Sequence, residues 1–228
     1  MLFDTHCHLD DPRLSAQLDE VLGRAREAGV KRIATIGCAQ GLDNVRAAVN
    51  LAQQHPDWIS ATVGVHPHDA KDLDEELSRA LTELGAEASV VAIGETGLDY
   101  HYDHSPRETQ QDAFRAQIAI ARQLGKPLVV HTRSAAEDTL RILREEEARD
   151  VGGIIHCFSE DAEFAAAALD LNFVSSFSGI VTFKSATAIQ DAARKQPADA
   201  LLIETDAPYL APSPKRGKLN EPAYVAHT

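Results

Sequence analysis

Histidine and acidic side chains recur in this sequence directly after short apolar segments. His6 and His8 flank Cys7 at the end of the first such segment. Alternate residues of a strand point to the same side, so both imidazoles can reach one metal ion, and Asp4 lies on that side as well. Taken alone, this Asp-x-His-x-His pattern fits equally well with the solvent-facing side of an amphipathic strand.

Four further apolar segments end in a side chain that can bind a metal ion. These side chains are Glu95, His131, His156 and Asp206. If the segments are parallel strands of one barrel, five strands deliver such groups at their C-terminal ends, where barrel enzymes build their active sites. This repeated placement predicts one shared metal site.

Hydrolysis of a stable ester needs an activated water, stabilisation of charge on the ester oxygens and a group that accepts a proton. Two divalent metal ions and one carboxylate provide all three. We expect His6, His8 and Asp206 on one ion, His131 and His156 on the other, and Glu95 bridging them with its two oxygens. Asp206 is also the expected catalytic proton acceptor. The mixed ligand set favours Zn²⁺, Mn²⁺ or Fe²⁺ over Mg²⁺, and the identity of the metal stays open.

Two residues outside this set are candidates for substrate binding. His66 follows the third apolar segment and is predicted to bind a phosphate or to orient a ligand, with a structural histidine as the alternative. Arg133 is predicted to clamp a phosphate oxygen, with a surface salt bridge as the alternative. Cys157 is expected to point away from the site as a small core residue.

The elements that must position these residues follow from hydrophobic patterning. Eight segments rich in Val, Ile, Leu or Phe alternate with stretches of helical composition, which is typical of a parallel sheet built from β-α units. The expected strands lie near residues 2–6, 32–37, 59–65, 90–94, 128–131, 154–156, 173–176 and 201–205. Apolar periodicity predicts helices over 14–29 and 108–125, each ended by a glycine. The fold class is therefore α/β, a (β/α)₈ TIM barrel.

Length and composition fit a single enzyme domain over residues 1–228. Hydrophobic residues form 44% and charged residues 25% of the 228, and no linker interrupts the chain before residue 211. No apolar run approaches the length of a membrane span and the N-terminus does not resemble a signal peptide, so we expect a cytoplasmic protein without a membrane partner. No obligate protein partner is evident. The net charge of -13 excludes broad electrostatic tracking along a nucleic acid, so any contact with one must be local.

Four motifs resemble those of the TatD family of metal-dependent deoxyribonucleases. They are residues 4–10 (DTHCHLD), 64–68 (GVHPH), 94–100 (GETGLDY) and 204–210 (ETDAPYL), within a resemblance that runs from residue 3 to residue 225. The resemblance implies a (β/α)₈ barrel that binds two or three divalent cations and removes nucleotides from DNA ends. It implies DNA as the partner, with RNA as the alternative, contacted through phosphates near the metals. All six ligand positions of the family pattern are occupied.

The sequence departs from the family pattern at its C-terminal end, and two alternative functions stay open. Family members continue through one or more helices that close the barrel, so the C-terminal closing helix is expected to be missing or truncated here. The alternative functions are a metallohydrolase of small amide, ester or lactone substrates and a non-catalytic metal-binding protein. The complete ligand set argues against the second of these.

Overall fold

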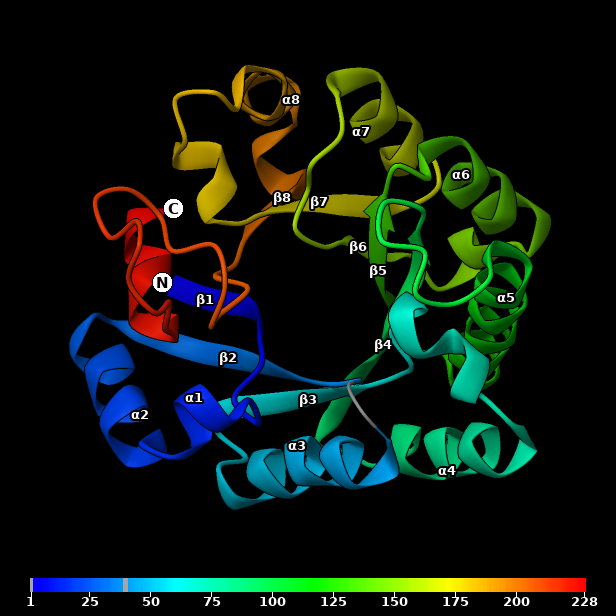
Figure 1. The fold of residues 1–228 in the computed structure, drawn as a ribbon, viewed down its shortest axis with the longest axis horizontal. Helices are drawn as coiled ribbons and strands as arrows, with labels where there is room; N and C mark the ends of the chain where they lie inside the picture. The colour runs from blue at the N-terminus through cyan, green and yellow to red at the C-terminus, as the bar shows by residue number, and fades with distance from the viewer. Residues whose placement is uncertain (1, 39–40) are drawn as a thin grey trace.

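The computed structural model describes residues 2–38 and 41–228, and its eight parallel strands follow one another around a nearly closed barrel (Figure 1). The strands are β1 (Leu2–Cys7), β2 (Val30–Gly37), β3 (Ile59–Val63), β4 (Val90–Asp99), β5 (Leu128–Arg133), β6 (Gly153–Ile155), β7 (Phe173–Phe177) and β8 (Leu201–Ile203). The fold is thus a (β/α)₈ barrel, which confirms the predicted class.

Helices surround the barrel, and short 3₁₀ turns occupy several of its connections. The α-helices are α1 (Pro12–Ser15), α2 (Leu18–Glu27), α3 (Leu42–Gln54), α4 (Glu75–Gly85), α5 (Arg107–Leu124), α6 (Ala136–Glu145), α7 (Ala162–Leu169) and α8 (Thr187–Lys195). The 3₁₀ helices are η1 (Pro67–Asp72), η2 (Ala148–Asp150), η3 (Gly179–Thr182), η4 (Ala198–Ala200) and η5 (Pro222–His227). None of these helices is both long and apolar enough to cross a membrane, as far as the described residues reach.

Apolar strand residues form the core between the barrel and its helices. Ile33, Ile93 and Leu128 are fully buried on three different strands, and Phe114 of α5 is buried against this core. Burial of such side chains is the main favourable contribution to folding. The polar ligand-type residues are thereby concentrated at the strand ends.

Of the two helices that the sequence predicts, one is divided into two helices and the other is observed as a single helix. Residues 14–29 form two helices, because the Asp11 side chain accepts a hydrogen bond from the Arg13 N–H and caps a short first helix, after which α2 begins at Leu18. The helix predicted over 108–125 is observed as α5. Its C-cap is Gly125, whose φ of +63° is a left-handed conformation that glycine adopts easily.

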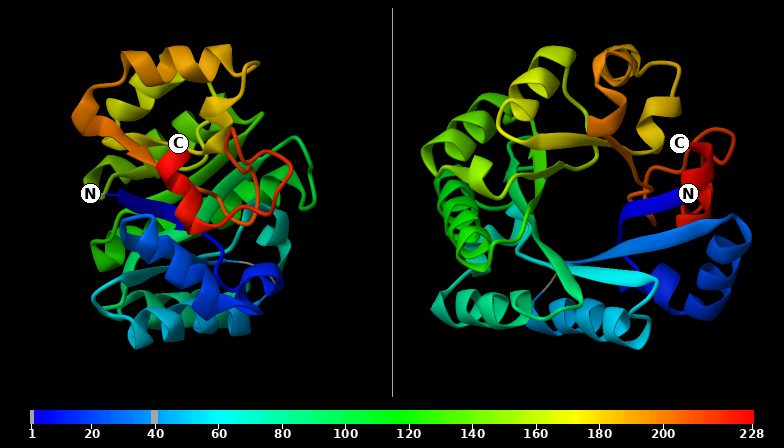
Figure 2. Two further views of the ribbon diagram at one scale, coloured as in Figure 1. Left: turned by 90° about the vertical axis from the view of Figure 1, so that its left-hand side faces the viewer. Right: turned by 180° about the vertical axis from the view of Figure 1, so that it is seen from behind.

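The barrel closes where β1 meets the segment after β8. Asp206 N–H donates to His6 O at 2.9 Å, and His8 N–H donates to Ala207 O at 2.8 Å. The 3₁₀ helix η5 packs against α2, β1 and β2, and no α-helix follows β8 among the residues described. The left panel of Figure 2 shows the loops after β4 and β8 projecting from one end of the barrel, away from the N-terminus. We call this end the mouth.

Candidate metal centre

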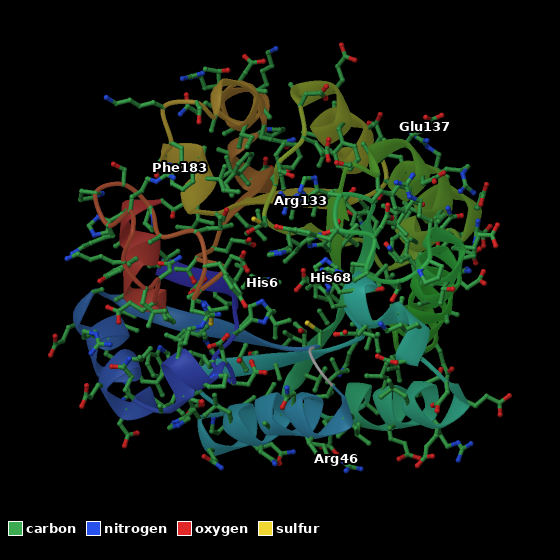
Figure 3. The ribbon with its side chains drawn as sticks, in the orientation of Figure 1. His6, Arg46, His68, Arg133, Glu137 and Phe183 are labelled. Carbon is green, nitrogen blue, oxygen red and sulfur yellow. The ribbon has the colours of Figure 1, made fainter. Side chains whose placement is uncertain are left out.

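The structure brings all six predicted ligands together at the mouth. They come from five parts of the barrel, namely β1, β4, β5, the end of β6 and the segment after β8. Figure 3 shows His6, His68 and Arg133 near the middle of the mouth, whereas Arg46 and Glu137 lie on the outer surface. Parallel strands with a common direction explain this convergence.

Glu95 lies at the centre of the cluster. Gly94 pairs with Val129 and Thr96 with Val130, so Glu95 is the extra residue of a β-bulge. A bulge re-aims a side chain, and here it directs the Glu95 carboxylate into the mouth. The sequence predicted that the strand ends near this residue, whereas β4 continues to Asp99.

One oxygen of Glu95 faces a first set of donor atoms. Glu95 Oε2 lies 3.3 Å from His6 Nε2 and 3.9 Å from His8 Nε2. The two imidazole nitrogens are 3.4 Å apart. Asp206 Oδ1 completes this set at 3.8 Å from His6 Nε2 and 3.6 Å from His8 Nε2. We call His6, His8 and Asp206 the Asp206 group.

The other oxygen of Glu95 faces a second set. Glu95 Oε1 lies 3.0 Å from His131 Nδ1, 3.2 Å from His156 Nε2 and 3.4 Å from His66 Nε2. We call His66, His131 and His156 the His131 group. His66 was predicted to contact substrate, and the structure places its ring among the donor atoms instead of apart from them. His156 stacks on His6 with ring centroids 3.5 Å apart, so it also borders the Asp206 group.

The donor atoms fit divalent metal ions. Four ligands held tetrahedrally around zinc lie roughly 3.3–3.6 Å from one another, given zinc–ligand bonds of about 2.0–2.2 Å. The Glu95 oxygens lie 3.0 to 3.9 Å from the imidazole nitrogens that face them. No Lys or Arg of the described chain forms an ion pair with Glu95 or Asp206. Two carboxylates that pair with imidazoles and with no Lys or Arg among the described residues are a suitable donor set for cations.

Two carboxylates that the sequence analysis did not single out contact the imidazole nitrogens of His131 and His156 that do not face Glu95. Asp99 Oδ2 lies 3.2 Å from His131 Nε2 and 3.0 Å from His68 Nε2. Glu204 Oε1 lies 2.8 Å from His156 Nδ1 and accepts a hydrogen bond from Cys157 N–H at 2.8 Å. A carboxylate beside the second nitrogen of a metal-binding imidazole fixes the ring and increases its basicity. Both residues belong to motifs quoted above, which was the available signal.

Asp4 has a different role from the ligands that follow it. It is fully buried, and its two oxygens accept hydrogen bonds from Thr205 N–H at 2.8 Å and Thr205 Oγ1 at 2.7 Å. These bonds tie β1 to the segment after β8. Asp4 therefore holds His6 and Asp206 in register and does not reach the donor cluster.

The family model for the TatD-related DNases matches residues 3–228 of this chain. The chain belongs to this family. A protein named as an uncharacterized metal-dependent hydrolase, YabD of Bacillus subtilis, is 46% identical over 227 residues, which cover all of this chain and 88% of that protein. YcfH of Escherichia coli, named in the same way, is 47% identical over 231 residues, covering 98% of this chain and 84% of its own length. The solved TatD homologue YjjV of E. coli has a TM-score of 0.90 at 29% identity, covering 99% of this chain and 86% of its own.

The electrostatics of this TatD-family centre favour an ionised bridge. Burial alone raises the pKa of Glu95, but the imidazoles of His156 and His66 bring it well below its ordinary value. Burial alone lowers the pKa of His131, and its contacts with Asp99 and Glu95 raise it above the ordinary value.

Arg133 borders the TatD-family site without touching its donor atoms. It is exposed, and its guanidinium lies over the ring of Tyr102 at 4.8 Å from the centroid. Within the described chain it forms no ion pair, so the predicted alternative of a surface salt bridge is not what the structure shows. An unpaired guanidinium beside a cation site is available to an anionic substrate group.

Cys157 departs from expectation. β6 ends at Ile155, and a φ of +44° at Cys157 takes the chain out of the extended conformation that the expectation assumed. The thiol is only partly buried and lies within ligand reach of His156 and Glu204. Cys157 is therefore not the fully buried core residue that was expected.

Proposed function

We propose that this protein is a two-metal hydrolase that cleaves phosphodiester bonds and removes nucleotides from DNA ends. Relatives at 46% and 47% identity are named metal-dependent hydrolases, and this chain is a metal-dependent hydrolase of the TatD family. The name of the matching family model supports DNA as the substrate. The observation that carries the two-metal proposal is the Glu95 carboxylate, whose two oxygens each face a separate set of donor atoms.

The proposed reaction divides among the residues of the two groups. His6, His8 and Asp206 would hold one cation, His66, His131 and His156 the other, and Glu95 would bridge them. Divalent cations in such a site lower the pKa of water and stabilise charge on phosphoryl oxygens.

Asp206 is the proposed proton acceptor of the attacking water. Burial alone raises its pKa, but the hydrogen bond with His8 and the neighbouring imidazoles lower it below the ordinary value, so the carboxylate is ionised. An ionised carboxylate with one oxygen in the donor cluster can receive a proton at its second oxygen. Arg133 would bind a non-bridging phosphate oxygen at the rim and orient the substrate.

The acidic charge of the protein limits how it can hold a nucleic acid. With a net charge of -13, attraction to a phosphate backbone must come from the bound cations and from local basic groups such as Arg133. We propose a cytoplasmic enzyme that contacts a short stretch of DNA, with RNA as a possible substrate.

Cleavage assays with matched substrates test the proposal. We would supply Zn²⁺, Mn²⁺, Mg²⁺ or no metal to the protein and measure release of nucleotides from end-labelled DNA and RNA, alongside hydrolysis of carboxylic esters and a lactone. The proposal expects metal-dependent nucleotide release that exceeds ester or lactone turnover. Metal-dependent hydrolysis of the small substrates without any cleavage of nucleic acid would establish the alternative small-molecule hydrolase.

A further inference from the structure

Three large aromatic side chains among the described residues are exposed, namely Phe3, Tyr102 and Tyr209. Phe3 lies near the start of β1, at the end of the barrel away from the mouth. Tyr102 and Tyr209 follow β4 and β8, and their exposed fractions are 50% and 49%. Both exposed tyrosines therefore lie at the mouth, on either side of the metal centre.

Tyr209 is fixed beside the Asp206 group. Its N–H donates to Asp206 O at 2.9 Å, and its carbonyl accepts a hydrogen bond from the buried Asn220 Nδ2 at 2.5 Å. The Tyr209 ring lies edge to face with His8, with centroids 6.3 Å apart. The backbone on both sides of this ring is thus held while half of the side chain stays in water.

Tyr102 is fixed beside the His131 group in a comparable way. Its N–H donates to Asp99 Oδ1 at 2.9 Å, and Asp99 also contacts His131. The Tyr102 ring lies perpendicular to His68, with centroids 5.4 Å apart, and parallel to His104, with centroids 5.6 Å apart. Tyr102 nevertheless remains 50% exposed. One carboxylate thereby positions both a proposed metal ligand and an exposed ring.

An arginine lies over each ring, but the two arginines differ in charge balance. Arg13 lies 4.7 Å from the Tyr209 centroid and is neutralised by Asp11, with a nitrogen-to-oxygen distance of 2.7 Å. Arg133 lies over Tyr102 and has no carboxylate partner within the described ranges. The Tyr209 side therefore offers an aromatic surface of little net charge, and the Tyr102 side offers an aromatic surface next to a free cation.

We propose that Tyr209 and Tyr102 are stacking platforms for nucleobases on the two sides of the scissile phosphodiester. This inference rests on the proposed function and assigns residues to its substrate contacts. Leaving aromatic surface in water contributes nothing to folding, whereas nucleobases stack on aromatic rings with little regard to sequence. Stacking also supplies binding that does not depend on positive charge, which suits an acidic protein.

Oligonucleotides with and without bases at the terminal positions test the proposal. We would compare Tyr209→Ala, Tyr209→Phe, Tyr102→Ala and Tyr102→Phe with the parent, using normal DNA and DNA whose terminal sugars are abasic. Each alanine variant should lose about 5- to 150-fold in kcat/KM on normal DNA, the range for loss of one stacked base. The phenylalanine variants should retain activity, and all variants should cleave abasic DNA as the parent does. Phe3→Ala, an exposed ring away from the mouth, is the control and should change neither rate.

Binding separates failure of this inference from failure of the proposed function. In an Asp206→Asn background we would measure fluorescence anisotropy with labelled normal and abasic DNA in the presence of metal. Tyr209→Ala should weaken binding of normal DNA and leave abasic DNA unaffected. Equal losses on both DNAs, or no loss on either, would overturn the stacking role even if the parent is a nuclease. A parent that binds DNA through these rings but never cleaves it would overturn the proposed function and keep the platforms.

Discussion

The two halves of the metal centre are built differently around one carboxylate. The Asp206 group comes from β1 and the segment after β8, and backbone hydrogen bonds between His6, His8, Asp206 and Ala207 set its spacing. The His131 group comes from β5 and from the segments that follow β3 and β6. Two carboxylates behind the rings, Asp99 and Glu204, orient two of its imidazoles.

The halves also differ in charge. The Asp206 group contains an anionic ligand of its own, whereas the three imidazoles of the His131 group all face the shared Glu95 Oε1 and no other carboxylate ligand. A cation in the Asp206 group is therefore held by more negative charge, and it lies next to the proposed proton acceptor. We expect the Asp206 group to govern the chemical step and the His131 group to govern how readily the second cation is lost.

The largest expected loss of activity is that of Asp206→Asn. Asp206→Asn keeps the size of the side chain and one oxygen ligand but removes the proton acceptor, so the rate should fall about 10²–10⁴-fold, the range for loss of a general base. At least one metal should still bind, and extra metal should not restore activity. Asp191→Asn on α8, a surface carboxylate paired with Lys195, is the control. Near-normal turnover at saturating metal would contradict the role given to Asp206.

Removal of the Glu95 side chain should have a different effect from Asp206→Asn, because Glu95 contacts both halves of the centre. Glu95→Ala leaves adjacent cations without their common counter-charge, so metal occupancy should fall from two ions per chain to one or fewer, and activity with it. High added metal should partly restore turnover, unlike in Asp206→Asn. Elemental analysis after dialysis measures the occupancy. Two ions at full occupancy in Glu95→Ala would remove the bridge from the model of the site.

The His131 group should respond selectively to loss of its supporting carboxylates. Asp99→Asn and Glu204→Gln keep the side-chain size but weaken the hold on His131 and His156, so the affinity for the second cation should fall about 10–100-fold, as is usual for such partners. Calorimetric titration should show one weakened site and one unchanged site. Equal weakening of both sites would show that the two halves are not separable.

Sequence patterns predict the candidate ligands that the structure brings together, but not the carboxylates that lie behind them. His6, His8, His131 and His156 follow apolar runs directly, so their type and position reveal them. The bulge at Glu95 cannot be predicted from the sequence pattern, because two glycines near it resemble the end of a strand, whereas the strand in fact continues. The contact of Glu204 with His156 joins residues 48 positions apart, so only the closed barrel brings the two together.

As the pH falls, the cation held by the His131 group should be lost first. Burial alone lowers the pKa of His131 and of His156, but Asp99 and Glu95 raise the first and Glu204 and Glu95 raise the second above the ordinary value of 6.5. A raised pKa means that protons compete with the cation already above that pH, so affinity for the second cation should weaken as the pH falls through the neutral range. In the Asp206 group the pKa of His6 is lowered and that of His8 is raised, and in the His131 group the pKa of His66 is lowered. Proton competition therefore involves two imidazoles of the His131 group, His131 and His156, and only His8 of the Asp206 group. Metal titrations from pH 8 to pH 6 should therefore show a steeper loss at one site, and parallel losses would contradict the comparison.

The smallest expected effect belongs to Arg133, which borders the His131 group but binds no metal. Arg133→Ala should raise KM or lower kcat/KM on DNA by about 10-fold, the lower end for loss of a hydrogen bond to a charged group, with metal content unchanged. Arg133→Lys keeps the charge but not the two-pronged geometry, so it should recover only part of the loss. Arg144→Ala, an exposed arginine on α6, is the matched control because it removes the same charge away from the mouth. If Arg133→Ala and Arg144→Ala lower activity equally, the effect is one of net charge, and the His131 side of the mouth carries no phosphate clamp.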